Sequence, residues 1–265
     1  MCSAIVAKDS IFRVGVGCLP SLLTDISCRP AEDEVHVWRI CADDWRGRNS
    51  QLKALLPDAA LTRAERFYYA RDRLRYVVAH GVMCLILAHS YLRVAPKTLI
   101  FGTAHNGKPH LTGPSHKPPL FFNLTHSADI ILLAVAAAEV GVDVERIREN
   151  ICWEDIAGHA FSRCEQRQLA NATPERRPEL FFYGWSRKEA FLKARGDGLR
   201  FPLDAFSVSL EPNNARLLEV PGDTEETQRW AMSGIDIGPS YCAATVLKAT
   251  ACRCRLINAH PCCFP

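Results

Sequence analysis

Two acidic residues in this 265-residue sequence have a spacing that could hold a cation. Asp143 and Glu145 lie in the segment Val-Gly-Val-Asp-Val-Glu over 140–145, whose apolar character predicts a strand. Side chains two residues apart on a strand leave the same face, so these carboxylates repel each other unless a cation or proton separates them. Two solvated charges at the end of a strand would have the same spacing, and these two residues alone do not decide between the alternatives.

A helix predicted over 180–195 adds a third carboxylate and two amines. Glu189 and Lys193 lie on the same helical face, four residues apart, and Lys188 is beside them. Mg²⁺ prefers a few carboxylates and completes its coordination with water and phosphate oxygens, while lysines neutralise the remaining phosphate charge. If the helix packs on the strand, the set predicts a magnesium-phosphate site. An ordinary surface ion pair between Glu189 and Lys193 would have the same spacing.

Two further segments offer groups that bind phosphate. His-Asn-Gly-Lys-Pro-His over 105–110 places Lys108 in a turn shaped by glycine and proline. Phe-Asn-Leu-Thr-His-Ser over 122–127 places Thr125 and His126 at the end of a predicted strand. Hydroxyl, amide and imidazole groups can all donate hydrogen bonds to phosphate oxygens. A single histidine after a strand is more often structural, so the prediction depends on the whole set.

The elements that would position these residues occur twice in the same order. The first half contains an alternating strand over 35–40, a capping-box pattern at Thr62 and Glu65, a helix over 71–92 that ends near Pro96, and a strand over 98–101.

The second half repeats this order from the strand over 140–145. A capping-box pattern at Ser162 and Glu165 precedes the helix over 180–195, which Gly196 and Gly198 end, and a strand is predicted over 206–210. We therefore expect an α+β fold of two similar α+β halves in one chain, packed as a pseudo-dimer. A ligand would bind in the cleft between the halves.

The composition is that of a soluble globular protein, with 48% hydrophobic and 23% charged residues. A net charge of +3 is too small for a general nucleic-acid binder. No uninterrupted apolar run approaches the roughly 18 residues of a membrane helix, and no targeting segment is recognisable. We therefore expect a cytoplasmic protein that binds neither nucleic acid nor membrane.

The sequence has 12 cysteines but no Cys-x-x-Cys pair. A disulfide framework is typical of short secreted chains, so most of these cysteines are expected to be small buried apolar residues. A zinc site in the C-terminal tail, at Cys252, Cys254, Cys262, Cys263 and His260, is a weaker alternative, because the spacing matches no common ligand pattern.

Four motifs in a fixed order resemble those of the Sfp-type 4′-phosphopantetheinyl transferases. Two carry the predicted site: Gly-Val-Asp-Val-Glu-Arg over 141–146 and Trp-Ser-Arg-Lys-Glu-Ala-Phe-Leu-Lys over 185–193, with Gly-Asp-Gly-Leu over 196–199 behind the second. The Gly-Lys-Pro turn over 107–109 and the segment 122–127 match as well. The first motif alone is weakly specific, but its pairing with the second is highly specific. The order of elements is most similar to that of the cyanobacterial members.

The resemblance implies what the residues should do. It implies that coenzyme A binds in the cleft, with Mg²⁺ held by Asp143, Glu145 and Glu189. Lys108, His126 and Lys193 would contact the phosphates, Thr125 would lie beside them, and Lys188 would support the same field. Arg75 would approach the nucleotide end, and Arg63 is a weaker candidate for the same role.

The sequence departs from the family pattern in the first-half helix. Met83 and Cys84 stand where the family usually has a Leu-Arg pair, and His80 stands where related sequences often have arginine. These changes remove positive charge near the proposed nucleotide end and are expected to weaken coenzyme A binding. We expect the chain to divide into an irregular segment 1–34, halves at 35–119 and 120–248, and a cysteine-rich tail 249–265 that has no counterpart in the family.

The activity that the resemblance implies is transfer of 4′-phosphopantetheine from coenzyme A to a serine of an acyl or peptidyl carrier protein, with release of 3′,5′-ADP. Glu189 would be the base and Lys193 would stabilise the departing phosphate. The chain length favours a broad, monomeric enzyme that serves carriers of polyketide and nonribosomal peptide synthesis over a fatty-acid-specific one. A non-catalytic protein that binds coenzyme A or a carrier is the alternative function.

Overall fold

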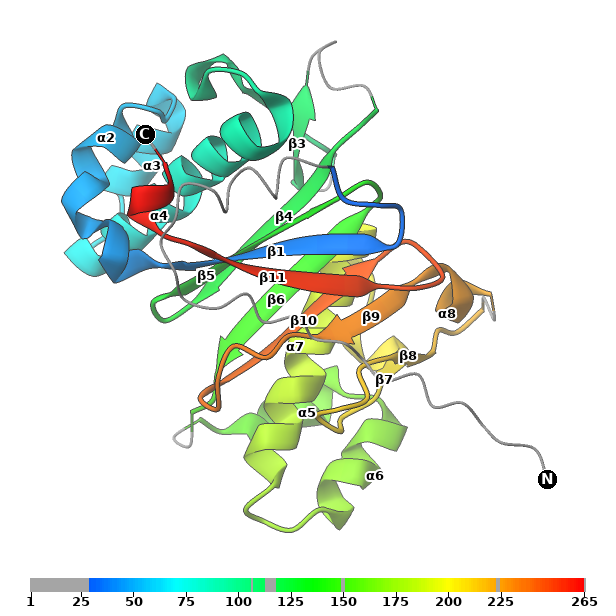
Figure 1. The fold of residues 1–265 in the computed structure, drawn as a ribbon. Coiled ribbons are helices and arrows are strands. Elements are labelled where there is room, and N and C mark those ends of the chain that lie inside the picture. Colours follow the sequence, from blue (N-terminus) through cyan, green and yellow to red (C-terminus); the bar gives the residue numbers. More distant parts are fainter. Residues whose placement is uncertain (1–28, 106, 113–117, 149–150, 223–224, 265) are drawn as a thin grey trace.

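The computed structural model describes residues 29–105, 107–112, 118–148, 151–222 and 225–264. The strands form two main sheets (Figure 1). The first has the order β11-β1-β5-β4 and the second the order β6-β10-β9. Their strands are β1 (Glu34–Cys41), β4 (Phe121–Ser127), β5 (Ile130–Ala136), β6 (Val140–Arg146), β9 (Ala231–Gly234), β10 (Tyr241–Leu247) and β11 (Arg253–Ala259).

Helices follow the first strand of each sheet. After β1 come a 3-10 segment (Ala42–Arg48), α2 (Asn49–Lys53), α3 (Asp58–Glu65), α4 (Ala70–Ile86), a π-helical turn (Leu87–Leu92) and a 3-10 turn (Pro96–Thr98). After β6 come α5 (Trp153–Ala160), α6 (Arg163–Asn171) and α7 (Arg177–Arg195), followed by 3-10 turns (Gly198–Arg200 and Leu203–Ala205). The remaining elements are the hairpins β2 (Ile100–Thr103) with β3 (Pro109–Thr112) and β7 (Ser207–Val208) with β8 (Leu217–Glu219), then α8 (Glu226–Arg229) and a 3-10 turn (Pro261–Cys263).

The two halves repeat one topology. The orders β1-β5-β4 and β6-β10-β9 match, and every pairing within them is antiparallel. Each half runs from its first strand through helices and a two-stranded hairpin to its last two strands. This arrangement confirms the expected α+β fold of two similar halves.

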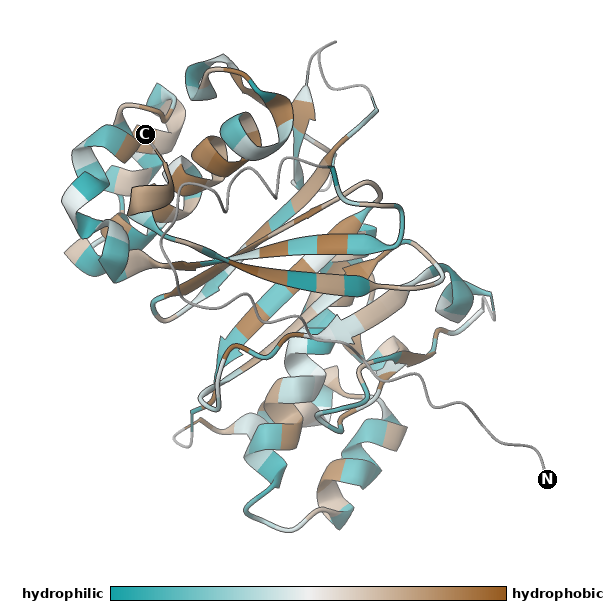
Figure 2. Cartoon of the chain, in the orientation of Figure 1, coloured by the Kyte–Doolittle hydropathy of each residue, from teal (hydrophilic) through white to brown (hydrophobic). Residues whose placement is uncertain are grey.

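The apolar residues form layers in the order helix, sheet, sheet, helix. One core joins α4 to the outer face of the first sheet, a second lies between the sheets, and two more join the second sheet to α5–α7 and the β7–β8 hairpin. Strand β5 (Ile130–Ala136) is buried on both faces. Figure 2 shows hydrophobic residues along the central strands and hydrophilic residues on the outer helices. Val142 and Val144 face the core between the sheets, which leaves the opposite face of β6 for its polar residues.

Of the two predicted capping boxes, the structure confirms only the second. Ser162 Oγ accepts a hydrogen bond from the Glu165 amide, and the Glu165 carboxylate accepts one from the Ser162 amide. Thr62 instead lies inside α3, which begins after Pro57. The extended backbone of Pro57 starts the helix at Asp58, several residues before the predicted cap.

Helix α4 and its π-helical continuation occupy the predicted span 71–92 and end at Arg93, which has a left-handed conformation. The segment Ala70–Leu92 is long and apolar enough to cross a membrane by length and composition, but 72% of its most apolar window is buried inside the protein. Core helices of globular proteins pass the same test, so this is weak evidence for a membrane segment.

Two of the expected segment boundaries need correction. The tail 249–265 is not a separate segment, because β11 pairs in parallel with β1 over Glu34–Ile40 and extends the first sheet. A boundary at 119/120 would remove β4 and β5 from the sheet that contains β1. The first residue of the predicted strand 98–101 lies in a 3-10 turn, and β2 begins at Ile100.

The cysteines are more varied than expected. Cys262 is disulfide-bonded, whereas the other described cysteines have free thiols. Cys84 and Cys242 are buried as predicted, but Cys152 and Cys164 are exposed.

Candidate active site

Helix α7 packs directly on β6, which brings the two main motifs together. The close approach requires a glycine at position 141, because a Cβ there would overlap the Ala190 carbonyl oxygen and the Ala194 amide nitrogen. Gly196, in a left-handed conformation, ends α7 as predicted. The helix face that carries Glu189 and Lys193 therefore meets the polar face of β6.

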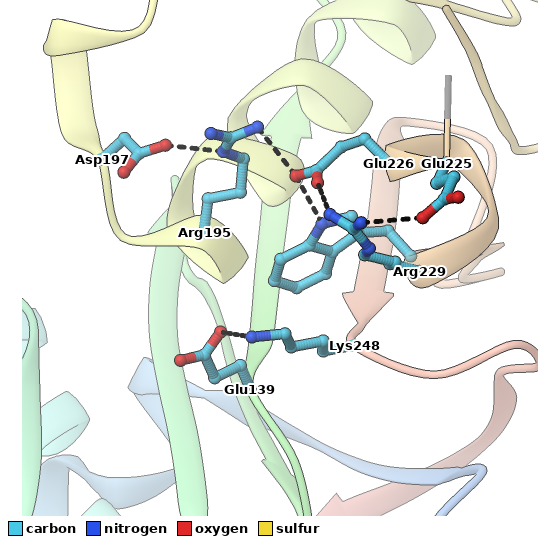
Figure 3. A network of polar contacts seen from close by, with 8 residues as sticks. Glu139, Arg195, Asp197, Glu225, Glu226, Arg229 and Lys248 are labelled. Carbon is cyan, nitrogen blue, oxygen red and sulfur yellow. Dashed lines mark hydrogen bonds and ion pairs between the residues drawn. The ribbon is translucent and has the colours of Figure 1, made fainter. Parts of the chain in front are cut away.

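The end of α7 is fixed by ion pairs on the outer side of the second half (Figure 3). Arg195 contacts Asp197 at 2.6 Å and Glu226 at 2.8 Å, and the Trp230 indole donates to the same Glu226 carboxylate. This network joins the C-terminal turn of α7, two residues after Lys193, to α8.

Asp143, Lys193 and Thr125 form the centre of the site. Lys193 Nζ lies 2.5 Å from Asp143 Oδ1 and 3.2 Å from Thr125 Oγ1, and the Thr125 hydroxyl donates to Asp143 Oδ1 at 3.1 Å. Asp143 is buried, and its second oxygen, Oδ2, has no hydrogen-bond partner. A buried carboxylate oxygen without a partner is costly, so this atom is available to a ligand.

The electrostatics show that the three predicted carboxylates lie near one another. Burial raises the pKa of Asp143 to about 7; Lys193 opposes this rise, and Glu145 and Glu189 add to it. Burial also raises the pKa of Glu189, which Lys193 lowers and Glu145 raises. Sequence and structure therefore agree on the grouping of these four residues.

Whether the site can bind a cation depends on the carboxylate oxygens of Asp143, Glu145 and Glu189. The described part of the chain has no group of three or more His, Cys, Asp or Glu side chains arranged to hold a metal ion, either here or at the C-terminal cysteines. Asp143 is instead neutralised by Lys193. The unpartnered Oδ2 of Asp143, with two further carboxylates in electrostatic reach, nevertheless has the oxygen chemistry that Mg²⁺ prefers.

Polar side chains of β4 bind β6 across the boundary between the two halves. Asn123 Oδ1 accepts a hydrogen bond from the Val142 amide at 2.9 Å. Ser127 Oγ donates to Glu145 at 3.0 Å and accepts from the Arg146 amide at 3.0 Å. With Thr125 between them, these residues lie on one face of β4 and fix β4 against the site strand.

Lys108 lies at the far end of the β6–α7 contact. Its Nζ donates to the carbonyl oxygens of Val140 at 3.0 Å and Ala194 at 3.1 Å. Burial lowers its pKa to about 8, and Glu139 opposes this shift. Lys108 thus joins the strand, the helix and the first-half hairpin next to the site.

Arg75 and His126 lie at the opposite end, beyond Glu145. Arg75 contacts Asp129 at 2.6 Å and Asp72 at 2.9 Å. Burial lowers the pKa of His126, and the positive charges of Arg75 and Lys193 lower it further. His126 is therefore within electrostatic reach of both cations, and its phosphate-binding role stays a prediction.

Helix α4 has no positive charge at positions 80 and 84, where related sequences often have arginine. Cys84 is 3% exposed, and burial raises the pKa of its thiol to about 12, so it is a neutral core residue. His80 Nδ1 donates a hydrogen bond to the Tyr76 carbonyl oxygen, and burial lowers the pKa of His80. Arg63 lies over the Tyr76 ring, 5.8 Å from the ring centroid.

Lys188 is not a ligand-binding residue, contrary to the prediction. Its side chain is fully buried and lies 2.8 Å from Glu165, and it donates to the carbonyl oxygens of Leu203 and Phe206. It lies one residue before Glu189, so a rotation of about 100° along the helix directs it to the other side of α7. The sequence spacing placed it beside the site, but its side chain points into the second-half core.

Comparisons with known proteins identify the family to which the two site motifs belong. The model of the 4′-phosphopantetheinyl transferase superfamily matches residues 139–246, and an N-terminal 4′-phosphopantetheinyl transferase model matches residues 37–139. The chain is 33% identical to the 4′-phosphopantetheinyl transferase HetI of Nostoc sp., over 82% of this chain and 88% of that protein. It belongs to the 4′-phosphopantetheinyl transferase superfamily.

Other relatives of this transferase carry the same name. A 4′-phosphopantetheinyl transferase of Bacillus subtilis is 30% identical over 68% of this chain and 77% of that protein. Among solved structures, holo-[acyl-carrier-protein] synthase of Thermotoga maritima aligns with 27% identity and a TM-score of 0.34, over 42% of this chain and 63% of that chain. The two family models meet at residue 139, between β5 and β6, which is where the structure divides the halves.

Some residues that shape the site of this transferase were not predicted. Asn123 and Ser127 were predicted only as possible phosphate donors within the segment 122–127, and their hydrogen bonds to β6 were not foreseen. Glu165 was predicted only as a cap, but it also binds Lys188 and accepts from the Val208 amide. Arg187, buried beside them, donates to the carbonyl oxygens of Ser209, Glu211 and Pro212.

Proposed function

We propose that this 4′-phosphopantetheinyl transferase moves the phosphopantetheine arm of coenzyme A onto a serine hydroxyl of an apo acyl or peptidyl carrier protein, with Mg²⁺ as cofactor. The observation that carries the magnesium requirement is the buried Asp143 with its unpartnered Oδ2, close to Glu145 and Glu189. Lys193, which is paired with Asp143 in the structure, would contact phosphate oxygens of the bound substrate.

Charge supports the placement of coenzyme A along the boundary between the halves. Three cations, Lys108, Lys193 and Arg75, follow one another from the β6–α7 contact to the turn after β4, and the His126 imidazole lies near the last two. A pyrophosphate near Lys193 and a nucleotide phosphate toward Arg75 would each meet a cation. Glu145 and Ser127 would then lie between these two positions.

In the reaction, the carrier serine oxygen forms a bond to the β-phosphorus and the bond to the bridging oxygen breaks. The electron pair leaves on 3′,5′-ADP, and the serine proton goes to a base. Glu189 is suited to be that base, because burial raises its pKa and α7 holds it rigidly beside Asp143. Lys193 can donate to the leaving phosphate. Bound Mg²⁺ would offset charge on the pyrophosphate, held by Asp143, Glu145 and Glu189.

A transfer assay tests this function. Purified protein, Mg²⁺, coenzyme A and a panel of apo carriers should give a carrier mass gain and 3′,5′-ADP in equal amounts. Glu189→Ala and Asp143→Ala should abolish both without unfolding the protein, whereas the exposed Glu32→Ala should change neither. Carrier binding without release of 3′,5′-ADP would support the non-catalytic alternative, which the names of the relatives do not favour.

The same proposal includes the oligomeric state of the enzyme, its location and its partners. Both halves contribute side chains to one site, so a single chain has all the residues named above and a monomer is sufficient. We assign the enzyme to the cytoplasm, where coenzyme A and carriers would be its partners, with no role for nucleic acid or membrane. A carrier panel that includes fatty-acid, polyketide and nonribosomal peptide carriers would show which pathway it serves.

A further inference from the structure

An exposed pair of tyrosines lies on the loop between α3 and α4. Tyr68 is 89% exposed and Tyr69 is 56% exposed, and their rings meet edge to face with centroids 4.9 Å apart. The Arg71 guanidinium lies over the Tyr69 ring, 5.3 Å from its centroid. In the described part of the chain, no other two adjacent large apolar side chains are this exposed. Exposed aromatic residues beside arginine are typical of protein–protein contact sites.

The surroundings of the pair are positively charged. Residues 63–75 contain five arginines and two carboxylates, and Arg63, Arg66 and Arg71 are exposed. A partner with an acidic face and apolar side chains would match both the charge and the rings.

The pair also borders the active site. Tyr69 is the N-cap of α4, and Arg75, six residues later, lies about 9 Å along the helix. Arg75 binds Asp129, which lies in the turn after β4, and β4 itself contains Thr125 and His126. A protein seated on the tyrosines would therefore lie next to the cleft in which its serine must react.

We infer that Tyr68, Tyr69, Arg66 and Arg71 form a docking surface for the carrier protein, through an acidic and partly apolar face of the carrier. The inference rests on the proposed transfer function and adds the surface that recognises the second substrate. A nucleotide is a poorer match, because nucleotides bind in concave pockets and the perpendicular rings leave no parallel slot for a base.

The test compares Michaelis constants for the two substrates. In the Tyr68→Ser/Tyr69→Ser variant, the KM for the carrier should rise about tenfold or more, while kcat and the KM for coenzyme A stay unchanged. Serine is a favoured N-cap, so α4 should remain intact, as circular dichroism and thermal unfolding can verify. Ile100→Ser, at another exposed apolar residue, should leave both KM values unchanged.

A second variant separates charge from fold. Arg66→Glu/Arg71→Glu should raise the carrier KM and weaken its dependence on ionic strength. A rise in the KM for coenzyme A alone would identify a nucleotide surface and overturn the inference, as would unchanged constants in both variants. A wild-type enzyme that transfers nothing to any carrier would instead overturn the proposed function, and the docking surface with it.

Discussion

Lys193 Nζ lies 2.5 Å from Asp143 Oδ1, and this ion pair connects the two motifs that form the site. It joins α7 to β6 at the level of Thr125, which comes from the other half of the chain. The pair holds a buried carboxylate whose second oxygen has no partner. Both the stability of this site and its chemistry should therefore depend on the protonation of Asp143.

Asp143 should make the stability of the ligand-free protein fall as the pH rises. Its pKa is about 7 when folded, against an ordinary value of 3.8. Between these values the folded chain keeps a proton that the unfolded chain has lost, so each increase in pH favours unfolding. Relative to Asp143→Asn, the wild type should lose on the order of 2 to 4 kcal/mol from pH 4 to pH 7.

Urea unfolding at several pH values measures this difference. Asp44→Asn, at an exposed aspartate, should show the same pH dependence as the wild type. Parallel stability curves for the wild type and Asp143→Asn would contradict the assignment of the proton to this residue.

Replacing Lys188 by methionine should mainly lower stability, whereas replacing Lys193 by methionine should mainly lower turnover. Lys188→Met leaves Glu165 buried without its cation and should lower the free energy of unfolding by about 3 to 5 kcal/mol. Lys193→Met also removes the cation of buried Asp143, but Asp143, with a pKa of about 7, can take up a proton instead. Since Lys193 is partly exposed and close to the proposed phosphates, Lys193→Met should mainly reduce turnover, by about a hundredfold or more. Thermal unfolding and the transfer assay on the same samples separate the two outcomes. Equal loss of stability in both variants would mean that Lys193 is also structural.

The error about Lys188 shows what sequence spacing can and cannot determine. The pattern of 185–193 places Lys188, Glu189 and Lys193 close together, but only packing decides which side of α7 meets β6. Gly141 allows this packing, because a Cβ at that position would overlap the helix backbone at Ala190 and Ala194. The partner of Lys188 is Glu165, on α6, and no periodicity in the sequence connects the two residues.

The repeat was predictable, but its asymmetry was not. In the ladders β1–β5 and β6–β10, Trp38 and Ile40 occupy the positions that Asp143 and Glu145 occupy in the second half. Both first-half residues are buried apolar side chains, so the repeat yields one acidic site per chain. Hydrophobic periodicity identified both strands, but the equivalence of individual positions required the register of the sheets.

Ser127 should orient Glu145 toward the cation. Its hydroxyl connects Glu145 to the Arg146 amide, so Ser127→Ala frees the carboxylate without removing it. Residues that orient metal ligands typically change metal affinity by about 10- to 100-fold. We expect Mn²⁺ binding, measured by calorimetry or electron paramagnetic resonance, to weaken in this range while the unfolding midpoint changes little. Ser50→Ala, at an exposed serine, is the matched control, and unaltered Mn²⁺ affinity in Ser127→Ala would exclude the orienting role.

Phe264 should stabilise the first half although it lies beyond both family models. Its ring packs against Trp38 and Trp45, and its carbonyl oxygen accepts a hydrogen bond from Arg48. Burial of Phe264 thus holds the end of β11 against the start of the helical region. Phe264→Ala should lower the free energy of unfolding by about 3 kcal/mol, because it leaves a cavity among buried rings.

The measurement for Phe264→Ala is urea unfolding combined with the transfer assay below the unfolding transition. Turnover per folded molecule should equal that of the wild type, because Phe264 contacts none of the site residues. Lys97→Ala, at an exposed position of the same half, should leave stability unchanged. Wild-type stability in Phe264→Ala would show that packing of this ring on Trp38 and Trp45 does not stabilise the first half. A truncation before Arg253 removes β11 itself, so it should expose the β1 edge and give aggregated protein.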